Sequence, residues 1–342
     1  MIPLQMLAGH PVTHIVFSTD GSTVAVAQPH YGVTLLERTT GHTLGVCALP
    51  RRDVLTGLTF CGDGRYLAAA SAKGVEVFDA TTGAPVVTDL GPYLKGLLLV
   101  DAGTVTVGVS AKGARVEWNP DPVTNPAFGY QSNYREASRA VDALSPDGRL
   151  AIFETGRRSV RRHGLFDLRA RRLVATVEHA EADPGYLKPD AAKFCPLGRR
   201  FAINDGRTLD VYDLDRLAAE SEDEQYADTP LVPRANSTNP NATQATAVAP
   251  MPHVSPETTF TLKPDQPDAE PWHPPFALLP DGRGLLVKRP RNRIQLWDAP
   301  TGTLVNEWSW RFEWVTCVAV STDGLTAVAG GRFGRVLLWD LD

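Results

Sequence analysis

The segment 320–342, "VSTDGLTAVAGGRFGRVLLWDLD", contains the pattern that decides the fold. Its Asp-Gly pair joins two apolar strands, because Asp-Gly supplies the positive φ that a tight hairpin requires. A second turn, rich in Gly and Arg, leads into a third strand that ends at Trp339-Asp340. The segment therefore predicts a small antiparallel sheet of short strands.

The same pattern recurs along most of the chain. Turns of the type S-x-D-G, some of them degenerate, occupy residues 17–21, 60–64, 144–148, 278–282 and 320–324, with weaker copies near residues 100 and 195. The predicted third strands end at Leu36-Glu37, Phe78-Asp79, Trp118-Asn119, Phe166-Asp167, Tyr212-Asp213, Trp297-Asp298 and Trp339-Asp340. Their spacing is near 42 residues except for one interval of 85. A period of this length predicts one four-stranded sheet per repeat.

These motifs resemble those of the WD-repeat β-propeller family, and the resemblance covers nearly the whole chain. It is carried by two Trp-Asp pairs, the repeated S-x-D-G turns and the period. It implies an all-β fold: a single domain, 1–342, forming a seven-bladed β-propeller of four-stranded antiparallel blades. The sequence departs from the family at its buried His, Ser/Thr, Asp and Trp network, since only Asp205 lies close to the usual Asp position. We therefore expect blade rigidity to depend more on apolar packing.

The interval of 85 residues is twice the period, so it could contain an eighth blade. Residues 216–256 are rich in Pro and acidic residues, and Tyr226 is their only aromatic residue. Such a composition buries too little apolar surface to offset the entropy of ordering the chain. We predict an irregular insertion there, seven blades in all, and the fourth strand of the fifth blade at 258–262.

The N-terminal residues 3–7 have the pattern of a fourth strand, and Gly9-His10 resembles the Gly-His pair of the family. We predict that residues 3–7 pair with residues 335–341 as the outer strand of the last blade. This pairing closes the ring without a covalent link and reduces its exposed strand edges.

Catalytic chemistry is not indicated. The predicted innermost strands are almost wholly apolar, and Asp142 is the one carboxylate among them, which makes neither a metal cage nor an acid/base pair. His10 and His14 span a turn and a strand start, so their spacing does not predict a zinc site. We expect no cofactor, no metal and no enzyme activity. A lactonase-like or quinoprotein-like propeller enzyme is the least favoured alternative.

Composition limits the compartment and the partners. The formal net charge is -5 and the pI is about 5.9, so no global basic field attracts nucleic acid or membrane. No segment approaches the roughly 20 apolar residues of a membrane span. The four cysteines are far apart (Cys47, Cys61, Cys195 and Cys317), which predicts reduced, buried thiols. We expect a cytoplasmic monomer, and the excess of Arg over Lys favours a bacterial source.

One predicted surface has a distinct character. In the family, the second-to-third and fourth-to-first strand connections share one face, which we call the top face. Clustered cations and large aromatic residues in these connections predict a partner-binding site: Lys73, Tyr93, Lys112, Arg158, Arg162, Tyr186, Arg207, Trp272, Arg289, Arg291, Trp310 and Arg332. Alternatively, the cations only solvate turns and the aromatic residues pack between blades, as expected for Trp314 at the start of an inner strand.

The sequence thus predicts a non-catalytic platform that binds a partner protein or an acidic peptide on a basic, aromatic top face. The second hypothesis is a nucleic-acid-binding propeller, since Arg residues interleaved with aromatic residues also fit single strands.

Overall fold

The computed structural model describes residues 2–4, 9–29, 31–49, 55–60, 64–71, 74–87, 94–100, 105–110, 115–118, 141–145, 150–154, 162–167, 172–178, 192–204, 208–217, 255–261, 274–289, 293–309 and 314–341. These residues form 27 β-strands and one helical turn at 214–217. They contain no helix that is long and apolar enough to cross a bilayer.

The strands of the N-terminal half form three antiparallel sheets, which we number in chain order. Sheet 1 contains β2 (His14–Phe17), β3 (Thr23–Gln28), β4 (Gly32–Glu37) and β5 (Thr43–Cys47). Sheet 2 contains β6 (Leu55–Phe60), β7 (Tyr66–Ser71), β8 (Gly74–Asp79) and β9 (Pro85–Val87). Sheet 3 contains β10 (Leu94–Val100), β11 (Val105–Ser110) and β12 (Arg115–Trp118).

The remaining strands form four sheets of four strands each. Sheet 4 contains β13 (Val141–Leu144), β14 (Leu150–Glu154), β15 (Arg162–Asp167) and β16 (Arg172–Glu178). Sheet 5 contains β17 (Ala192–Phe194), β18 (Arg200–Asn204), β19 (Thr208–Asp213) and β20 (Thr258–Thr261). Sheet 6 contains β21 (Phe276–Leu278), β22 (Gly284–Arg289), β23 (Arg293–Asp298) and β24 (Thr303–Ser309). Sheet 7 contains β25 (Val315–Val320), β26 (Thr326–Gly331), β27 (Val336–Asp340) and β1 (Ile2–Leu4).

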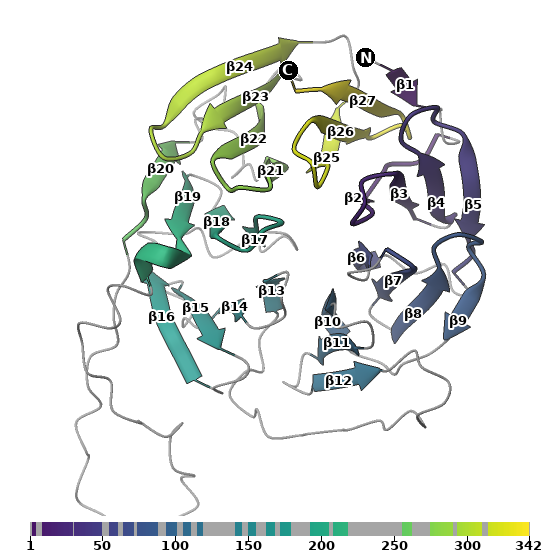
Figure 1. Ribbon diagram of the computed structural model, residues 1–342, viewed down its shortest axis with the longest axis horizontal. Helices are drawn as coiled ribbons and strands as arrows, with labels where there is room; N and C mark the ends of the chain where they lie inside the picture. The colour runs from purple at the N-terminus through teal and green to yellow at the C-terminus, as the bar shows by residue number, and fades with distance from the viewer. Residues whose placement is uncertain are drawn as a thin grey trace, which may run out of the picture.

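The sheets follow one another around a common centre, with the first strand of each sheet innermost and the last at the rim (Figure 1). The third strand of every sheet ends at or within one residue of the end that the repeat predicted. β20 occupies the predicted fourth-strand position of sheet 5 and pairs with β19. The sequence prediction of an all-β fold with four-stranded antiparallel sheets is confirmed.

Local side chains make the S-x-D-G turns. In the first copy, the Ser18 hydroxyl donates to Asp20 at 2.6 Å and accepts from the backbone N–H of Thr23 at 2.9 Å. Gly21 has φ +69°, a conformation that side chains rarely tolerate. Ser321, Asp323 and Gly324 repeat this arrangement in sheet 7. The Ser and Asp side chains of the motif therefore supply hydrogen-bond partners to other polar groups of the same turn.

Burial rises from the rim to the middle of each sheet. Every residue of β26 is buried, as are five of the six residues of β3 and of β22. In contrast, β24 at the rim has no buried residue. Second strands are covered by neighbouring sheets on both faces, and this is why "TAVAGG" reads as a nearly continuous apolar run.

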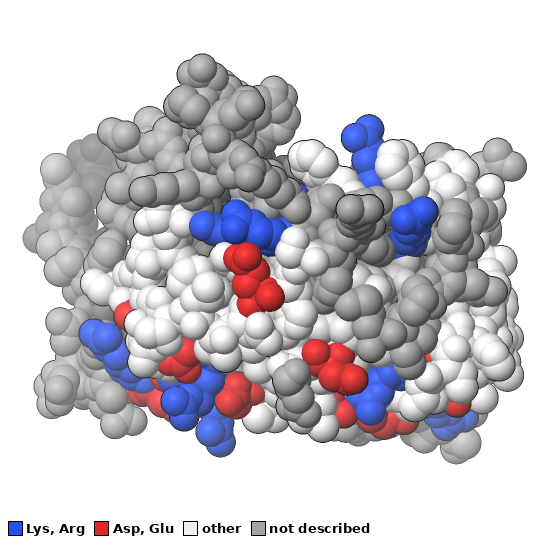
Figure 2. All heavy atoms as spheres, turned by 90° about the horizontal axis from the view of Figure 1, so that it is seen from above, with Lys and Arg blue, Asp and Glu red and all other residues white. Residues whose placement is uncertain are grey.

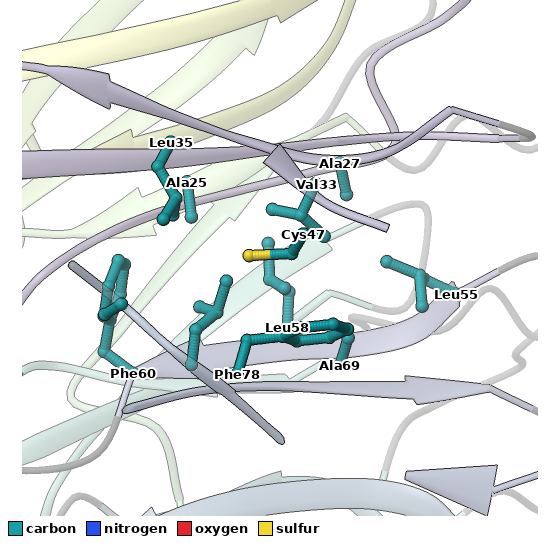
Figure 3. Packing of buried hydrophobic residues seen from close by; sticks show 12 residues of the cluster. Ala25, Ala27, Val33, Leu35, Cys47, Leu55, Leu58, Phe60, Ala69 and Phe78 are labelled. Carbon is teal, nitrogen blue, oxygen red and sulfur yellow. The ribbon is translucent and has the colours of Figure 1, made fainter. Parts of the chain in front are cut away.

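Adjacent sheets are held together by apolar clusters. Between sheets 1 and 2, Leu35 and Cys47 face Leu58, Phe60 and Phe78, and the Cys47 sulfur points into the cluster (Figure 3). Comparable clusters join sheets 4 and 5, 5 and 6, 6 and 7, and 7 and 1. Apolar packing thus provides the contact between blades, as expected. The Trp297 indole donates to Gln295 on its own strand at 3.2 Å.

Sheet 7 contains strands from both ends of the sequence. β1 runs antiparallel to β27, with Ile2 opposite Leu338 and Leu4 opposite Val336. The strand starts one residue earlier than predicted, and residues 5–7 of the prediction lie outside the described residues. Pro3 fits because β1 is the outermost strand, where a missing N–H leaves no ladder bond unmade.

Two predictions concern residues that are not described. The predicted insertion at 216–256 is described only at its ends, where Arg216 and Leu217 belong to the helical turn and 255–257 precede β20. The four-stranded repeat also implies a fourth strand for sheet 3, and the segment between β12 and β13 lies outside the described residues.

Candidate interaction surface

The connections between strands divide into two faces. The top face carries the second-to-third connections, of which the one after β26 is described wholly and the one after β3 in part. It also carries the residues before each innermost strand, such as His10 and Trp314. The bottom face carries the S-x-D-G turns and the third-to-fourth connections. Because each strand reverses direction, side chains in the two classes of turn point to opposite sides of the molecule.

Charged side chains on the bottom face are paired with each other. Arg38 of sheet 1 contacts Asp323 of sheet 7 at 2.7 Å. Arg200 lies 2.7 Å from Asp213 and 2.9 Å from Glu257, which ties three segments of sheet 5 together. Acidic and basic groups interleave along the lower side of the edge-on view, whereas basic groups predominate along the upper side (Figure 2).

The pair between Arg38 and Asp323 affects protonation. Partial burial opposes ionisation of Asp323, but hydrogen bonds from Arg38, from the Ser321 hydroxyl and from the backbone N–H of Leu325 outweigh it. Together they lower the pKa of Asp323 to about 2. The carboxylate therefore stays charged and engaged across the neutral range.

Three large aromatic side chains are exposed on the top face. Tyr31 is 53% exposed, Trp314 is 55% exposed and Phe333 is 59% exposed. The expectation that Trp314 packs between blades is wrong, because the residue is more than half exposed. Side chains of this size are usually buried, so their exposure sets this face apart.

A buried lysine lies beneath one of these rings. Lys288, near the end of β22, is 2% exposed, and its Nζ lies 4.3 Å from the centre of the Trp314 ring. A buried ammonium is costly unless electron-rich groups compensate its charge. Lys288 of sheet 6 thus contacts the exposed ring of Trp314, which belongs to sheet 7.

Hydrogen bonds connect the three aromatic positions. The backbone N–H of Arg332 donates to the carbonyl of Trp314 at 2.9 Å, which joins the connection that contains Phe333 to the start of β25. The backbone N–H of Val12 donates to Gly331 at 3.0 Å, and the side chain of Gln28 donates to His10 at 2.8 Å. The His10 ring packs on Tyr31 with centres 4.7 Å apart. These contacts link the segments that carry Tyr31, Trp314, Arg332 and Phe333, and we call these four top-face residues the aromatic patch.

Two of the predicted site residues can be located in detail. Arg332 is exposed in the aromatic patch, and Arg289 is half-buried directly after Lys288. Arg162 is the first residue of β15. The other predicted residues lie outside the described part of the chain: Lys73, Tyr93, Lys112, Arg158, Tyr186, Arg207, Trp272, Arg291 and Trp310.

The sequence prediction missed Tyr31, Phe333 and Lys288. Tyr31 and Phe333 each precede a glycine of positive φ, Gly32 and Gly334, in a second-to-third connection. Residues in such tight turns project from the fold, so an aromatic residue before these glycines was a usable signal. In that class of connection the prediction rested on cations alone.

Metal ligands do not cluster among the residues that the structure describes. No group of three or more His, Cys, Asp or Glu side chains is placed there to hold a metal ion. Burial raises the pKa of the Cys47 thiol to about 12, and the nearby Asp79 adds to this. Such a thiol stays protonated and unreactive.

Comparisons with known proteins identify the fold. No protein-family model and no curated protein matches the sequence. The β-propeller domain of Cps50 (Swd1) from Myceliophteria thermophila superimposes with a TM-score of 0.66 at 16% identity, covering 100% of both chains. The chain has the fold of the WD-repeat β-propellers. A chain in the structure of the mitotic checkpoint complex has a TM-score of 0.64 at 14% identity, covering 99% of this chain and 91% of that one.

Proposed function

We propose that this protein is a seven-bladed propeller, closed by β1, which binds a partner protein or an acidic peptide on its top face without catalysing a reaction. The observation that carries the proposal is the aromatic patch, where three large rings are exposed beside Arg332. We further propose that it acts in the cytoplasm as a monomer. The predicted residues outside the described part of the chain would extend this surface.

The chemistry of the patch supports a protein partner. Tyr, Trp and Arg are enriched at the centres of protein interfaces, because they supply a large contact area with few rotatable bonds. Arg289 and Arg332 favour an acidic partner by charge complementarity. On the bottom face, Arg38 and Arg200 already form ion pairs with carboxylates of this protein.

The absence of catalysis is part of the proposal. The described innermost strands present mainly apolar residues, and the fold is also found in a protein of the mitotic checkpoint complex, a multi-protein assembly. A fold shared at such low identity does not transfer a partner, so the partner has to be found by experiment.

Affinity capture with charge-reversed variants tests the proposal. The double variant Arg289→Glu, Arg332→Glu should lose the proteins that the wild type captures from its native extract. The matched control is Arg283→Glu, a bottom-face residue whose side chain is 66% exposed. It should capture the same proteins as the wild type. If the top-face variant retains them, the interaction site lies elsewhere.

Nucleic-acid binding is the second candidate, because Arg332 lies between two exposed aromatic residues, a pattern that also suits the stacking of bases. Titration of a single-stranded oligonucleotide at increasing salt distinguishes the two. Contact with many phosphates would lose affinity steeply as salt rises, with little sequence preference. A protein complex with an apolar centre should be far less sensitive to salt.

A further inference from the structure

The burial of Lys288 beneath an exposed ring is the starting observation. Lysine is almost never fully buried unless its charge is compensated, yet Lys288 is 2% exposed. Its ammonium lies 4.3 Å from the centre of the Trp314 ring, which is 55% exposed. The cation therefore occupies the protein side of an aromatic group that is open to solvent on its other side.

This contact restricts the position of Trp314 before any partner binds. The ring is held by Lys288 from β22, and the carbonyl of the same residue is held by the N–H of Arg332. A side chain fixed in advance loses little conformational entropy on binding. Trp314 differs in this respect from an exposed aromatic residue that is free to rotate.

The same contact determines which ligand the ring accepts. The ring quadrupole already interacts with the Lys288 cation, Arg289 is the next residue of β22, and Arg332 lies in the connection between β26 and β27. A second cation, such as a lysine or methylated lysine of a partner, would be repelled by these charges. An aromatic side chain can pack on the exposed part of the ring, and neighbouring carboxylates can pair with the two arginines.

We propose that Trp314 is the anchor of the aromatic patch, that Lys288 is its positioning residue, and that the patch receives a segment of a partner protein in which an aromatic residue is flanked by acidic residues. This rests on the proposed function of the top face. It adds the identity of the anchor and the chemistry of the recognised segment.

Three labelled peptides of equal length test this selectivity by fluorescence anisotropy. The first has one Tyr flanked by Glu residues, the second replaces that Tyr by Ala, and the third replaces the Glu residues by Lys. Wild-type protein should bind the first peptide at least tenfold more tightly than either of the others. Equal binding of the first two, tighter binding of the Lys peptide, or no binding of the first peptide overturns the proposal.

Protein variants then test the two assigned roles. Trp314→Ala should weaken binding of the Tyr-Glu peptide about tenfold, and Trp314→Phe should weaken it less. Lys288→Met keeps the length and apolar stem of the side chain but removes the charge, so it should reduce the preference for Tyr over Ala about threefold. The control is Leu325→Ala, on the bottom face and 53% exposed, which should change nothing.

The outcomes separate this inference from the proposed function. A selectivity that survives Lys288→Met at an unchanged melting temperature removes the positioning role. If Trp314→Ala keeps full affinity while Arg289→Glu, Arg332→Glu loses the native partner, the top face remains the site and the anchor is wrong. If the native partner also binds the charge-reversed protein, the proposed function itself fails.

Discussion

Replacement of Gly32 by Ala should destabilise the protein more than the same change at Gly9 or at Gly330, for two separable reasons. Gly32 has φ +97°, and a Cβ added there would lie 2.4 Å from the carbonyl oxygen of Cys47. That oxygen belongs to the backbone of β5, which cannot move aside as a flexible side chain could. The turn between β3 and β4 would have to shift, and Tyr31 with it.

The two other glycines isolate the two contributions. Gly9 has φ +65° with nothing within 4 Å of an added Cβ, so Gly9→Ala should cost only the backbone strain, about 1 kcal/mol. At Gly330 no positive φ is involved, but the added Cβ would lie 2.6 Å from Val12 and 2.7 Å from Cys317, which should cost about 1 to 3 kcal/mol. Gly32→Ala combines both effects and should cost about 3 to 4 kcal/mol.

Thermal unfolding followed by circular dichroism measures the series. For a chain of this size, 1 kcal/mol corresponds to roughly 1 to 2 °C in Tm, so Gly32→Ala should lower Tm by about 5 °C and Gly9→Ala by no more than about 2 °C. Equal shifts for the two variants would refute the reasoning, because backbone strain alone would then account for both.

Three further predictions concern stability and reactivity. Asp323→Asn should lower the free energy of unfolding by about 1 kcal/mol at pH 7, a small value because the ion pair with Arg38 is partly exposed. Because the pKa of Asp323 is depressed, the difference in stability between the two proteins should be constant above about pH 4 and vanish as the pH falls towards 2. Acid titration of both proteins measures this difference. Phe78→Ala, in the cluster between sheets 1 and 2, should cost about 3 to 5 kcal/mol by chemical denaturation, and a loss below about 1 kcal/mol would contradict the packing. Cys47 should resist alkylation in the native protein and react only after unfolding, as mass spectrometry of labelled peptides would reveal; rapid native labelling would show that the thiol is accessible.

The repeated sheets could be predicted from sequence because their signals are local. The Asp-Gly of "FSTDG" supplies both the positive φ of Gly21 and the hydrogen bonds of Asp20 within five residues. The ends of the third strands could be predicted from an equally local signal, because an apolar run stops there at a polar residue. β20 could be placed because it is the first strand-like segment after a stretch too polar to pack.

The surface was harder to predict because exposure depends on residues that are distant in sequence. Trp314 precedes an inner strand, where a large aromatic residue ordinarily packs between sheets. Its ring instead lies over Lys288, a residue of the neighbouring sheet that resembles an ordinary charged strand end in the sequence. The start of β1 was also missed by one residue, because its register depends on backbone bonds to β27 that leave little trace in the side-chain pattern.

The pairing of β1 with β27 also determines when the protein can finish folding. Ile2 and Leu338 lie at opposite ends of the 342-residue sequence, so their hydrogen bonds cannot form until the last strand has left the ribosome. Sheets 1 to 6 can form in order during synthesis, whereas β1 lacks its partner until β27 has been made. A ribosome stalled before β27 would therefore carry a chain whose first strand has no partner, and such chains should be preferred clients of chaperones and proteases.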